Sequence, residues 1–223
     1  MDLLKYTGEV QIDLEFANPS STFQIHSQAP VEILGITDQN SQVLSYTEKP
    51  YSILEVSLKT ETLGKFSVRF TFKALIHKTH KGCYVSFSGT EKMVTSHFEP
   101  NYGRMALPCF DEPGTKSTFD LRVRVSPDWK VISNMPGVFN PDENLHTFST
   151  SPLMSLYLLH WTICQHHQIS TSLDSTTISI FTREPENSAV FLDLAKDCLE
   201  FFNQLFGIPY PLPKLDLICV FRI

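Results

Sequence analysis

The chain has 223 residues, of which 42% are hydrophobic and 19% charged, and its formal net charge is −6. A chain of this length and composition can fold around a sizeable core and is not disordered. Lys and Arg are scattered and form no basic stripe, so we expect no nucleic-acid partner.

The sequence shows no targeting or membrane-spanning segment. Residues 1–5 contain no apolar run typical of a signal peptide, and the longest apolar run, residues 153–164, is shorter than the roughly 20 residues that a membrane helix needs. We therefore expect a cytoplasmic protein without a membrane partner. The cysteines are odd in number, widely spaced and without a Cys-x-x-Cys pair, which indicates reduced, buried thiols. They are Cys83, Cys109, Cys164, Cys198 and Cys219.

Most of the chain is predicted to form short β-strands. In residues 10–16 apolar and polar side chains alternate, which is typical of a strand with one buried face, and Asn18-Pro19-Ser20 is predicted to end it. Residues 66–72 and 119–125 alternate in the same way. Many short strands without helices between them indicate a mostly β fold, an antiparallel sandwich or saddle. Further short strands are predicted at residues 23–26, 31–36 and 53–58, and weaker strand candidates are residues 129–132, 147–149, 156–163 and 177–181.

The pattern changes near residue 185. Apolar residues then recur at helical spacing, which predicts a helix with Ser188 as N-cap and Gly207 just past its end. Three prolines force residues 208–213 to run extended, and the apolar residues 215–220 predict a strand buried on both faces. We expect an all-β domain over residues 1–185, followed by residues 186–223 as a fragment of a second domain. The helical positions are Phe191, Leu194, Ala195, Cys198, Leu199, Phe202, Leu205 and Phe206.

No motif for catalysis or metal binding is present. The sequence contains no His-Glu-x-x-His, no Gly-x-Ser-x-Gly and no glycine-rich phosphate loop, so no catalytic residue and no metal ligand is predicted. The scattered histidines are interpreted as surface or hydrogen-bonded residues. Cys109, between Pro108 and Phe110, is expected to be a buried structural thiol whose pKa is raised by its apolar surroundings.

One segment, residues 95–113, combines charged, aromatic and proline residues. If residues 96–99 are extended, His97 and Glu99 share one face, and a carboxylate beside an imidazole could hold a substrate ammonium group. The alternative is a structural hairpin in which Arg104 pairs with an acidic residue, Asp111 or Glu112. Spacing alone favours this structural interpretation.

The same segment carries a family resemblance. His97-Phe98-Glu99-Pro100, followed by Arg104 and then by residues 107–113 (Leu-Pro-Cys-Phe-Asp-Glu-Pro), resembles the N-terminal domain of the aminopeptidase N family of zinc metallopeptidases. Three further blocks follow in the family's order, and the absence of a membrane anchor makes the soluble puromycin-sensitive type the most similar. These blocks are residues 133–136 (Ser-Asn-Met-Pro), residues 150–159, and residues 206–216.

The resemblance implies a saddle-shaped antiparallel β-sandwich, here expected to lack its first strand, and then the start of a thermolysin-like catalytic domain. It implies that Glu99 binds the free α-amine of a peptide, with His97 where the family usually has Gln. In the family, zinc is bound by a His-Glu-x-x-His motif beyond the last predicted strand. This chain ends before that point, and Phe221-Arg222-Ile223 does not match the family's continuation.

Two functional hypotheses follow. In the first, the chain is the substrate-binding and structural N-terminal domain of a zinc-dependent aminopeptidase that removes N-terminal residues from peptides. It then holds no cofactor, is inactive alone, and meets the peptide N-terminus only when the catalytic domain is present. In the second, it is a stand-alone, non-catalytic β module that binds a protein or peptide, with a protein partner covering the helix at residues 188–206.

Overall fold

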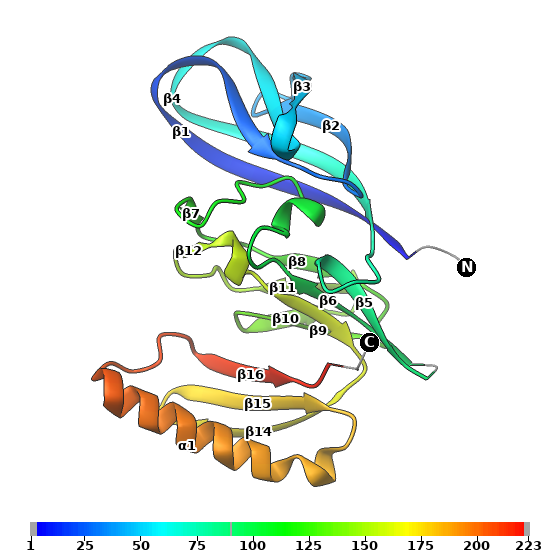
Figure 1. Ribbon diagram of the computed structural model, residues 1–223, viewed down its shortest axis with the longest axis vertical. Coiled ribbons are helices and arrows are strands. Elements are labelled where there is room, and N and C mark those ends of the chain that lie inside the picture. The colour runs from blue at the N-terminus through cyan, green and yellow to red at the C-terminus, as the bar shows by residue number, and fades with distance from the viewer. Residues whose placement is uncertain (1–3, 90, 221–223) are drawn as a thin grey trace. The chain divides into compact units, whose positions relative to one another are not determined.

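The computed structural model describes residues 4–89 and 91–220, and within them it is mostly β, with several antiparallel sheets and a single α-helix near the C-terminal end (Figure 1). This confirms the predicted fold class. Residues 221–223, noted above for their mismatch with the family, lie outside the described residues. None of the helices in the described part combines the length and the apolar character needed to cross a membrane.

The described chain forms two compact units. The first comprises Met1–Val85, Ser96–Ser117 and Met154–Leu158. The second comprises Ser86–Thr95, Thr118–Leu153 and Leu159–Ile223. The domain division expected at residue 185 stays a prediction.

Two long strands organise the first unit. β1 (Lys5–His26) runs antiparallel to β4 (Ile53–Leu75), and β2 (Glu32–Asp38) and β3 (Ser45–Lys49) also pair with β4. Because successive side chains of a strand point to opposite faces, the alternating apolar residues gather into one core. Its buried members are Phe23, Ile25, Ile36, Leu44, Leu54, Val56, Phe66, Val68 and Phe70.

The prediction that Asn18-Pro19-Ser20 ends the first strand is wrong. β1 continues to His26, and its register with β4 shifts between Phe16 and Ser20 and again between Ser20 and Thr22. Proline cannot donate a ladder hydrogen bond, so within sheets it is confined to edge strands and bulges. β1 lies at the edge of its sheet, which is why Pro19 is tolerated there.

Short elements complete the first unit. Of these, β7 pairs antiparallel with β12, which brings Ser117 opposite Met154. The strand predicted at residues 156–163 instead begins as a 3-10 turn. The elements are η1 (Pro50–Ser52), η2 (Gly103–Met105), β7 (Lys116–Ser117), β12 (Met154–Ser155) and η3 (Leu156–Leu158).

The second unit contains shorter strands in several sheets. Only Arg122–Arg124 of the strand predicted at residues 119–125 is regular, and at its start the N–H of Phe119 donates to the Ser151 hydroxyl at 2.9 Å. The sheet orders are β5-β6-β13-β9 and β10-β11-β8, and β5 and β6 extend into the first unit. The strands are β5 (Gly82–Ser88), β6 (Glu91–His97), β8 (Arg122–Arg124), β9 (Lys130–Ser133), β10 (Gly137–Asn140), β11 (Leu145–Phe148) and β13 (Trp161–Cys164).

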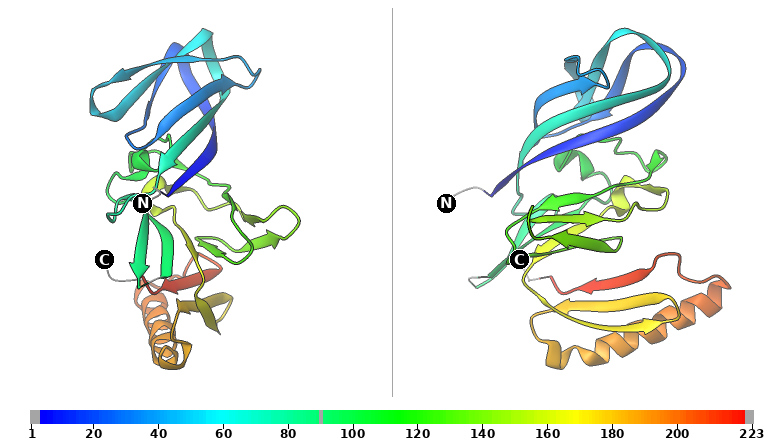
Figure 2. Two further views of the ribbon diagram at one scale, coloured as in Figure 1. Left: turned by 90° about the vertical axis from the view of Figure 1, so that its right-hand side faces the viewer. Right: turned by 180° about the vertical axis from the view of Figure 1, so that it is seen from behind.

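The C-terminal part of this unit has a parallel strand pair. β14 (His167–Leu173) and β15 (Thr176–Thr182) form a hairpin, and β16 (Lys214–Ile218) pairs parallel with β15. Parallel neighbours need a long crossover, usually a helix. Here the crossover contains η4 (Pro185–Asn187) and α1 (Ala189–Phe206), and α1 lies along one face of the three strands (Figure 1; Figure 2).

The predicted helix is confirmed, but the role of Ser188 and the burial of the following strand differ from the predictions. Gly207 adopts the left-handed conformation at φ 67°, as expected for a residue that ends a helix. Ser188 precedes the helix, yet its hydroxyl donates to the Glu184 carbonyl at 2.8 Å instead of capping a helical N–H. β16 is half-buried throughout, not buried on both faces, because it lies at the edge of its sheet.

Two of the five cysteines contradict the expectation of buried thiols. Cys83, Cys109 and Cys164 are buried, whereas Cys198 on α1 and Cys219 beyond β16 are exposed. Burial raises the pKa of Cys109 and of Cys164, which keeps these thiols protonated and unreactive.

A maleimide applied to the native chain should therefore label two cysteines quickly, and all five after unfolding in denaturant. Mass spectrometry would count the labels. The double variant Cys198→Ser/Cys219→Ser should take up none in its native state. Fast labelling of Cys109 would contradict its burial.

Candidate functional site

The predicted substrate-binding residues flank the end of β6. His97 is the last residue of that strand, so the extended segment is shorter than predicted and Glu99 lies in the turn beyond it. Both side chains are exposed, while Phe98 between them is only 1% exposed. The alternation expected from the sequence is therefore present: an acidic and a basic group face solvent on either side of a buried aromatic anchor.

Local contacts hold this turn. The N–H of Tyr102 donates to the Phe98 carbonyl at 2.7 Å. The Tyr102 ring lies 6.3 Å from the His97 ring between centroids, and the Lys81 ammonium lies 5.0 Å from the centre of the same Tyr102 ring, within the range of cation–π attraction. These contacts limit the freedom of the backbone that carries Glu99.

A buried ion pair stabilises the loop. The Nε of Arg104 lies 2.8 Å from the Oδ2 of Asp111, with side chains only 13% and 2% exposed, and the N–H of Arg104 donates to the same oxygen at 3.2 Å. The structural interpretation of this part of the segment is thus confirmed with Asp111 as the partner. Glu99 takes no part in this ion pair, so the loop combines a buried ion pair with an exposed carboxylate.

The loop is also packed closely against β1. Gly103 has no room for a side chain, since a Cβ there would lie 2.6 Å from Leu156 Cδ2 and 2.9 Å from Asp111 Oδ1. The Tyr6 hydroxyl donates to the Ala106 carbonyl at 2.6 Å, and the N–H of Gln28 donates to the Arg104 carbonyl at 2.8 Å. Glu99 is therefore presented by a well-supported scaffold.

Sequence reasoning missed His26, which lies beside this loop. His26 exchanges two backbone hydrogen bonds with Cys109, at 2.9 and 3.0 Å, and its Nδ1 accepts from the N–H of Asp111 at 3.3 Å. Burial, followed by the nearby Arg104 guanidinium, lowers the pKa of His26, which suits a neutral ring that accepts at Nδ1. No local sequence signal could reveal this contact, because the partners are 85 residues apart.

The loop also borders two hollows in the first unit, and neither is lined by His97 or Glu99. The larger, of about 340 Å³, is lined by residues of β1, the start of β4 and the loop, including His26, Phe110 and Glu112. The smaller is lined by Pro100, the acidic pair 111–112 and residues of η3. His97 and Glu99 are both exposed on the surface of the loop, outside these two hollows.

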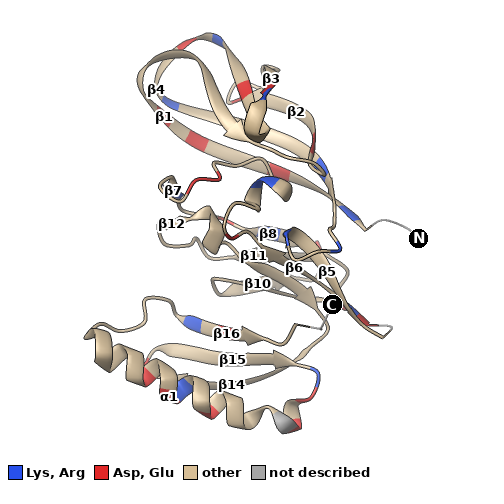
Figure 3. Cartoon of the chain, viewed as in Figure 1, with Lys and Arg blue, Asp and Glu red and all other residues tan. Residues whose placement is uncertain are grey.

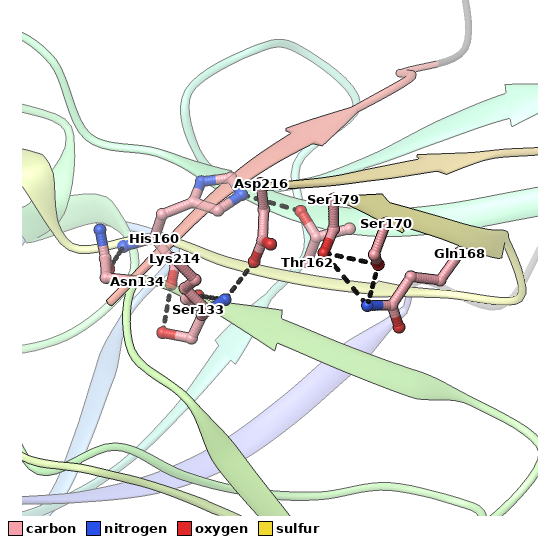
Figure 4. A network of polar contacts seen from close by, with 9 residues as sticks. All are labelled: Ser133, Asn134, His160, Thr162, Gln168, Ser170, Ser179, Lys214 and Asp216. Atoms are coloured by element: carbon pink, nitrogen blue, oxygen red, sulfur yellow. Dashed lines mark hydrogen bonds and ion pairs between the residues drawn. The ribbon is translucent and has the colours of Figure 1, made fainter. Parts of the chain in front are cut away.

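A polar network in the second unit joins two of the blocks quoted for the family resemblance (Figure 4). Lys214 pairs with Asp216 and donates to the Ser133 carbonyl at 2.6 Å. The Asn134 side-chain oxygen accepts from the N–H of His160 at 2.8 Å, and the Ser133 hydroxyl donates to the His160 carbonyl at 2.7 Å. Lys214 and Asp216 are only 16% and 10% exposed, and the hydrogen bond from Lys214 joins β16 to the end of β9.

The described residues do not fit a zinc site. Within residues 4–89 and 91–220, no group of three or more His, Cys, Asp or Glu side chains could hold a metal ion. A structural or catalytic zinc needs at least three such protein ligands.

Lys and Arg are dispersed over many strands (Figure 3).

Comparison with known proteins agrees with the family resemblance of the motifs. Residues 1–158 match the Peptidase M1 N-terminal domain. The chain is 30% identical to the puromycin-sensitive aminopeptidase of Caenorhabditis elegans over 99% of its own length and 25% of that protein. It is 31% identical to the probable aminopeptidase 1 of Sulfurisphaera tokodaii, over 98% and 28% of the two chains.

A third relative is the endoplasmic reticulum aminopeptidase 1 of Rattus norvegicus, 29% identical over 99% of this chain and 26% of that protein. The chain thus spans about a quarter of the length of these curated relatives. The family resemblance expected from the motifs is confirmed, and the chain belongs to the Peptidase M1 N-terminal domain family.

Proposed function

We propose that this chain serves as the substrate-binding and structural N-terminal domain of a zinc-dependent aminopeptidase that removes N-terminal residues from peptides. Membership of the peptidase family and similarity to three aminopeptidases support this proposal. The zinc ligands would have to come from outside the described residues, because these contain no suitable cluster. The chain alone is then inactive, and we propose a cytoplasmic location for it.

Glu99 is the proposed contact for the free α-amine of the peptide. The observation that carries this role is an exposed carboxylate held in place by the buried Phe98 and the ion-paired loop. A carboxylate accepts charge-assisted hydrogen bonds from an ammonium group, which are stronger than neutral ones. A neutral His97 could hydrogen-bond beside it, whereas a protonated His97 would repel the amine.

A chimaera tests this role, with residues 1–223 replacing the matching part of the nematode puromycin-sensitive aminopeptidase. Glu99→Gln should raise KM for an aminoacyl-coumarin amide by roughly 10- to 100-fold, since a hydrogen bond between charged groups contributes about 1.5–3 kcal/mol. Glu61→Gln, which removes an exposed charge from β4, should leave KM unchanged. An unaltered KM in the Glu99 variant would remove Glu99 from the amine site.

The same assay tests the dependence on a catalytic domain. The chain alone, given zinc ions and the coumarin substrate, should release no coumarin above the blank. Zinc-dependent release by the chain alone would overturn the proposal.

The alternative function, a stand-alone binding module, is favoured by one observation, the exposed apolar side of α1.

A further inference from the structure

His26, the last residue of β1, binds the loop of residues 104–111 through both its backbone and its side chain. The backbone exchanges two hydrogen bonds with Cys109, at 2.9 and 3.0 Å. The side-chain Nδ1 accepts a further one from the N–H of Asp111 at 3.3 Å. Just beyond β1, the N–H of Gln28 donates to the Arg104 carbonyl at 2.8 Å. The end of β1 therefore closes the loop.

The contacts of His26 continue into the buried ion pair. Asp111, whose N–H is bound by the His26 ring, is the partner of Arg104, and the Nη2 of Arg104 also donates to the Asp111 carbonyl at 3.4 Å. The Nη1 of Arg104 donates to the carbonyl of Tyr51, just before β4, at 3.3 Å. One chain of polar contacts thus joins the end of β1, the loop and the approach to β4.

The hydrogen bond from Asp111 fixes the protonation state of the His26 ring. A backbone N–H can only donate, so Nδ1 must offer a free lone pair and the ring proton must lie on Nε2. An imidazolium carries a proton on both nitrogens and accepts no hydrogen bond. Protonation would therefore set an N–H of the ring against the N–H of Asp111 and replace this hydrogen bond by repulsion.

The charges around the ring act in both directions. Burial and then the Arg104 guanidinium lower the pKa of His26, whereas the carboxylates of Glu112 and Asp111 oppose that shift. Ile53, the partner of His26 on β4, carries no charge. The His26 side chain is half-buried and lines the hollow of about 340 Å³, so a proton can reach the ring from solvent while the loop is closed.

We propose that His26 is a pH-sensitive latch, whose neutral ring holds residues 104–111 against the end of β1 and whose protonation releases them. Because the pKa of His26 is lowered in the folded chain, this contribution is fully present above the ordinary value of about 6.5 and is lost as the pH falls below it. Glu99 precedes the loop in the same segment, so the latch would also regulate the proposed amine site. That consequence rests on the proposed function, whereas the tests below are independent of it.

Nitrogen NMR of the full chain tests the protonation state without any substitution. At neutral pH the His26 ring should show a bare Nδ1 and a protonated Nε2, since Nδ1 accepts from Asp111. A ring proton on Nδ1 at neutral pH would overturn the proposal.

Hydrogen exchange tests the release of the loop. The protection factor of the Asp111 amide, corrected for the intrinsic exchange rate at each pH, should fall roughly 10-fold from about pH 8 to about pH 5. The amide of Val68, a fully buried residue of β4, should keep its protection over the same range. A parallel loss at Val68 would mean that the whole unit opens, and unchanged protection of Asp111 would mean that protonation releases nothing. Either result would overturn the latch.

The variant His26→Asn separates the ring from the other titrating groups. Its side-chain oxygen lies close to the position of Nδ1, can accept from the N–H of Asp111 and does not titrate. The protection of the Asp111 amide should then no longer depend on pH. His167→Asn is the control: His167 is exposed on β14 of the second unit, so this variant should behave as the native chain does. A pH-dependent loss that persists in His26→Asn would assign the effect to the carboxylates and overturn the proposal.

Discussion

Arg104→Ala should lower the free energy of unfolding by about 3–5 kcal/mol, the usual result of removing one partner of a buried ion pair. The Asp111 carboxylate is 2% exposed and accepts from both the side chain and the N–H of Arg104. Without the guanidinium it would keep a buried charge with less compensation. Urea unfolding monitored by circular dichroism would measure the loss.

An exposed ion pair provides the control for Arg104. Lys73 and Glu32 lie 2.8 Å apart, with side chains 50% and 61% exposed, so Lys73→Ala should change stability far less than Arg104→Ala. In a double-mutant cycle, Asp111→Ala should lower the free energy of unfolding by less in the Arg104→Ala background than in the native chain. If the losses of the two single variants simply add in the double variant, the interaction between Arg104 and Asp111 makes no contribution of its own to stability.

Phe98→Ala should also lower the free energy of unfolding, by about 3–5 kcal/mol, the usual range for a buried phenylalanine. The side chain is 1% exposed, so its removal leaves a cavity beneath the loop. The loss should also loosen the turn, because Tyr102 is hydrogen-bonded to the Phe98 carbonyl. Hydrogen exchange of the Tyr102 amide would report that loosening beside the unfolding measurement.

Phe87→Ala is the matched control for Phe98. Phe87 lies on β5 and is 47% exposed, so its truncation removes little buried surface. Its effect on stability should be well below that of Phe98→Ala. A similar loss in both variants would mean that the anchor beneath Glu99 does not hold the loop.

Local patterns were sufficient for several features of this protein. Alternation in residues 10–16 and 66–72 identified the two longest strands, since a half-buried strand must alternate. Helical spacing and Gly207 identified α1 and its end. His97 and Glu99 are exposed around the buried Phe98, as the predicted alternation required, although the strand ends at His97 and Glu99 lies in the turn beyond it.

Other features depend on partners that are distant in the sequence. Pro19 is accommodated in β1 because that strand is at an edge with a register shift, and a sheet edge is not encoded locally. His26 is placed beside Asp111 by the fold alone. The smaller burial of β16 likewise reflects its position in the sheet.

The sequence by itself determined the β-rich class, the single α-helix of the described chain, and the family, because all three depend on local periodicity and on short motifs. The tertiary structure decided which of the possible partners Arg104 takes, how Lys214 reaches Ser133, and which side of α1 is left in solvent. A helix with two apolar sides presents both equally in its sequence. Only the packing of one side on β14–β16 shows that the other is exposed, because burial is a property of the neighbours and not of the residue.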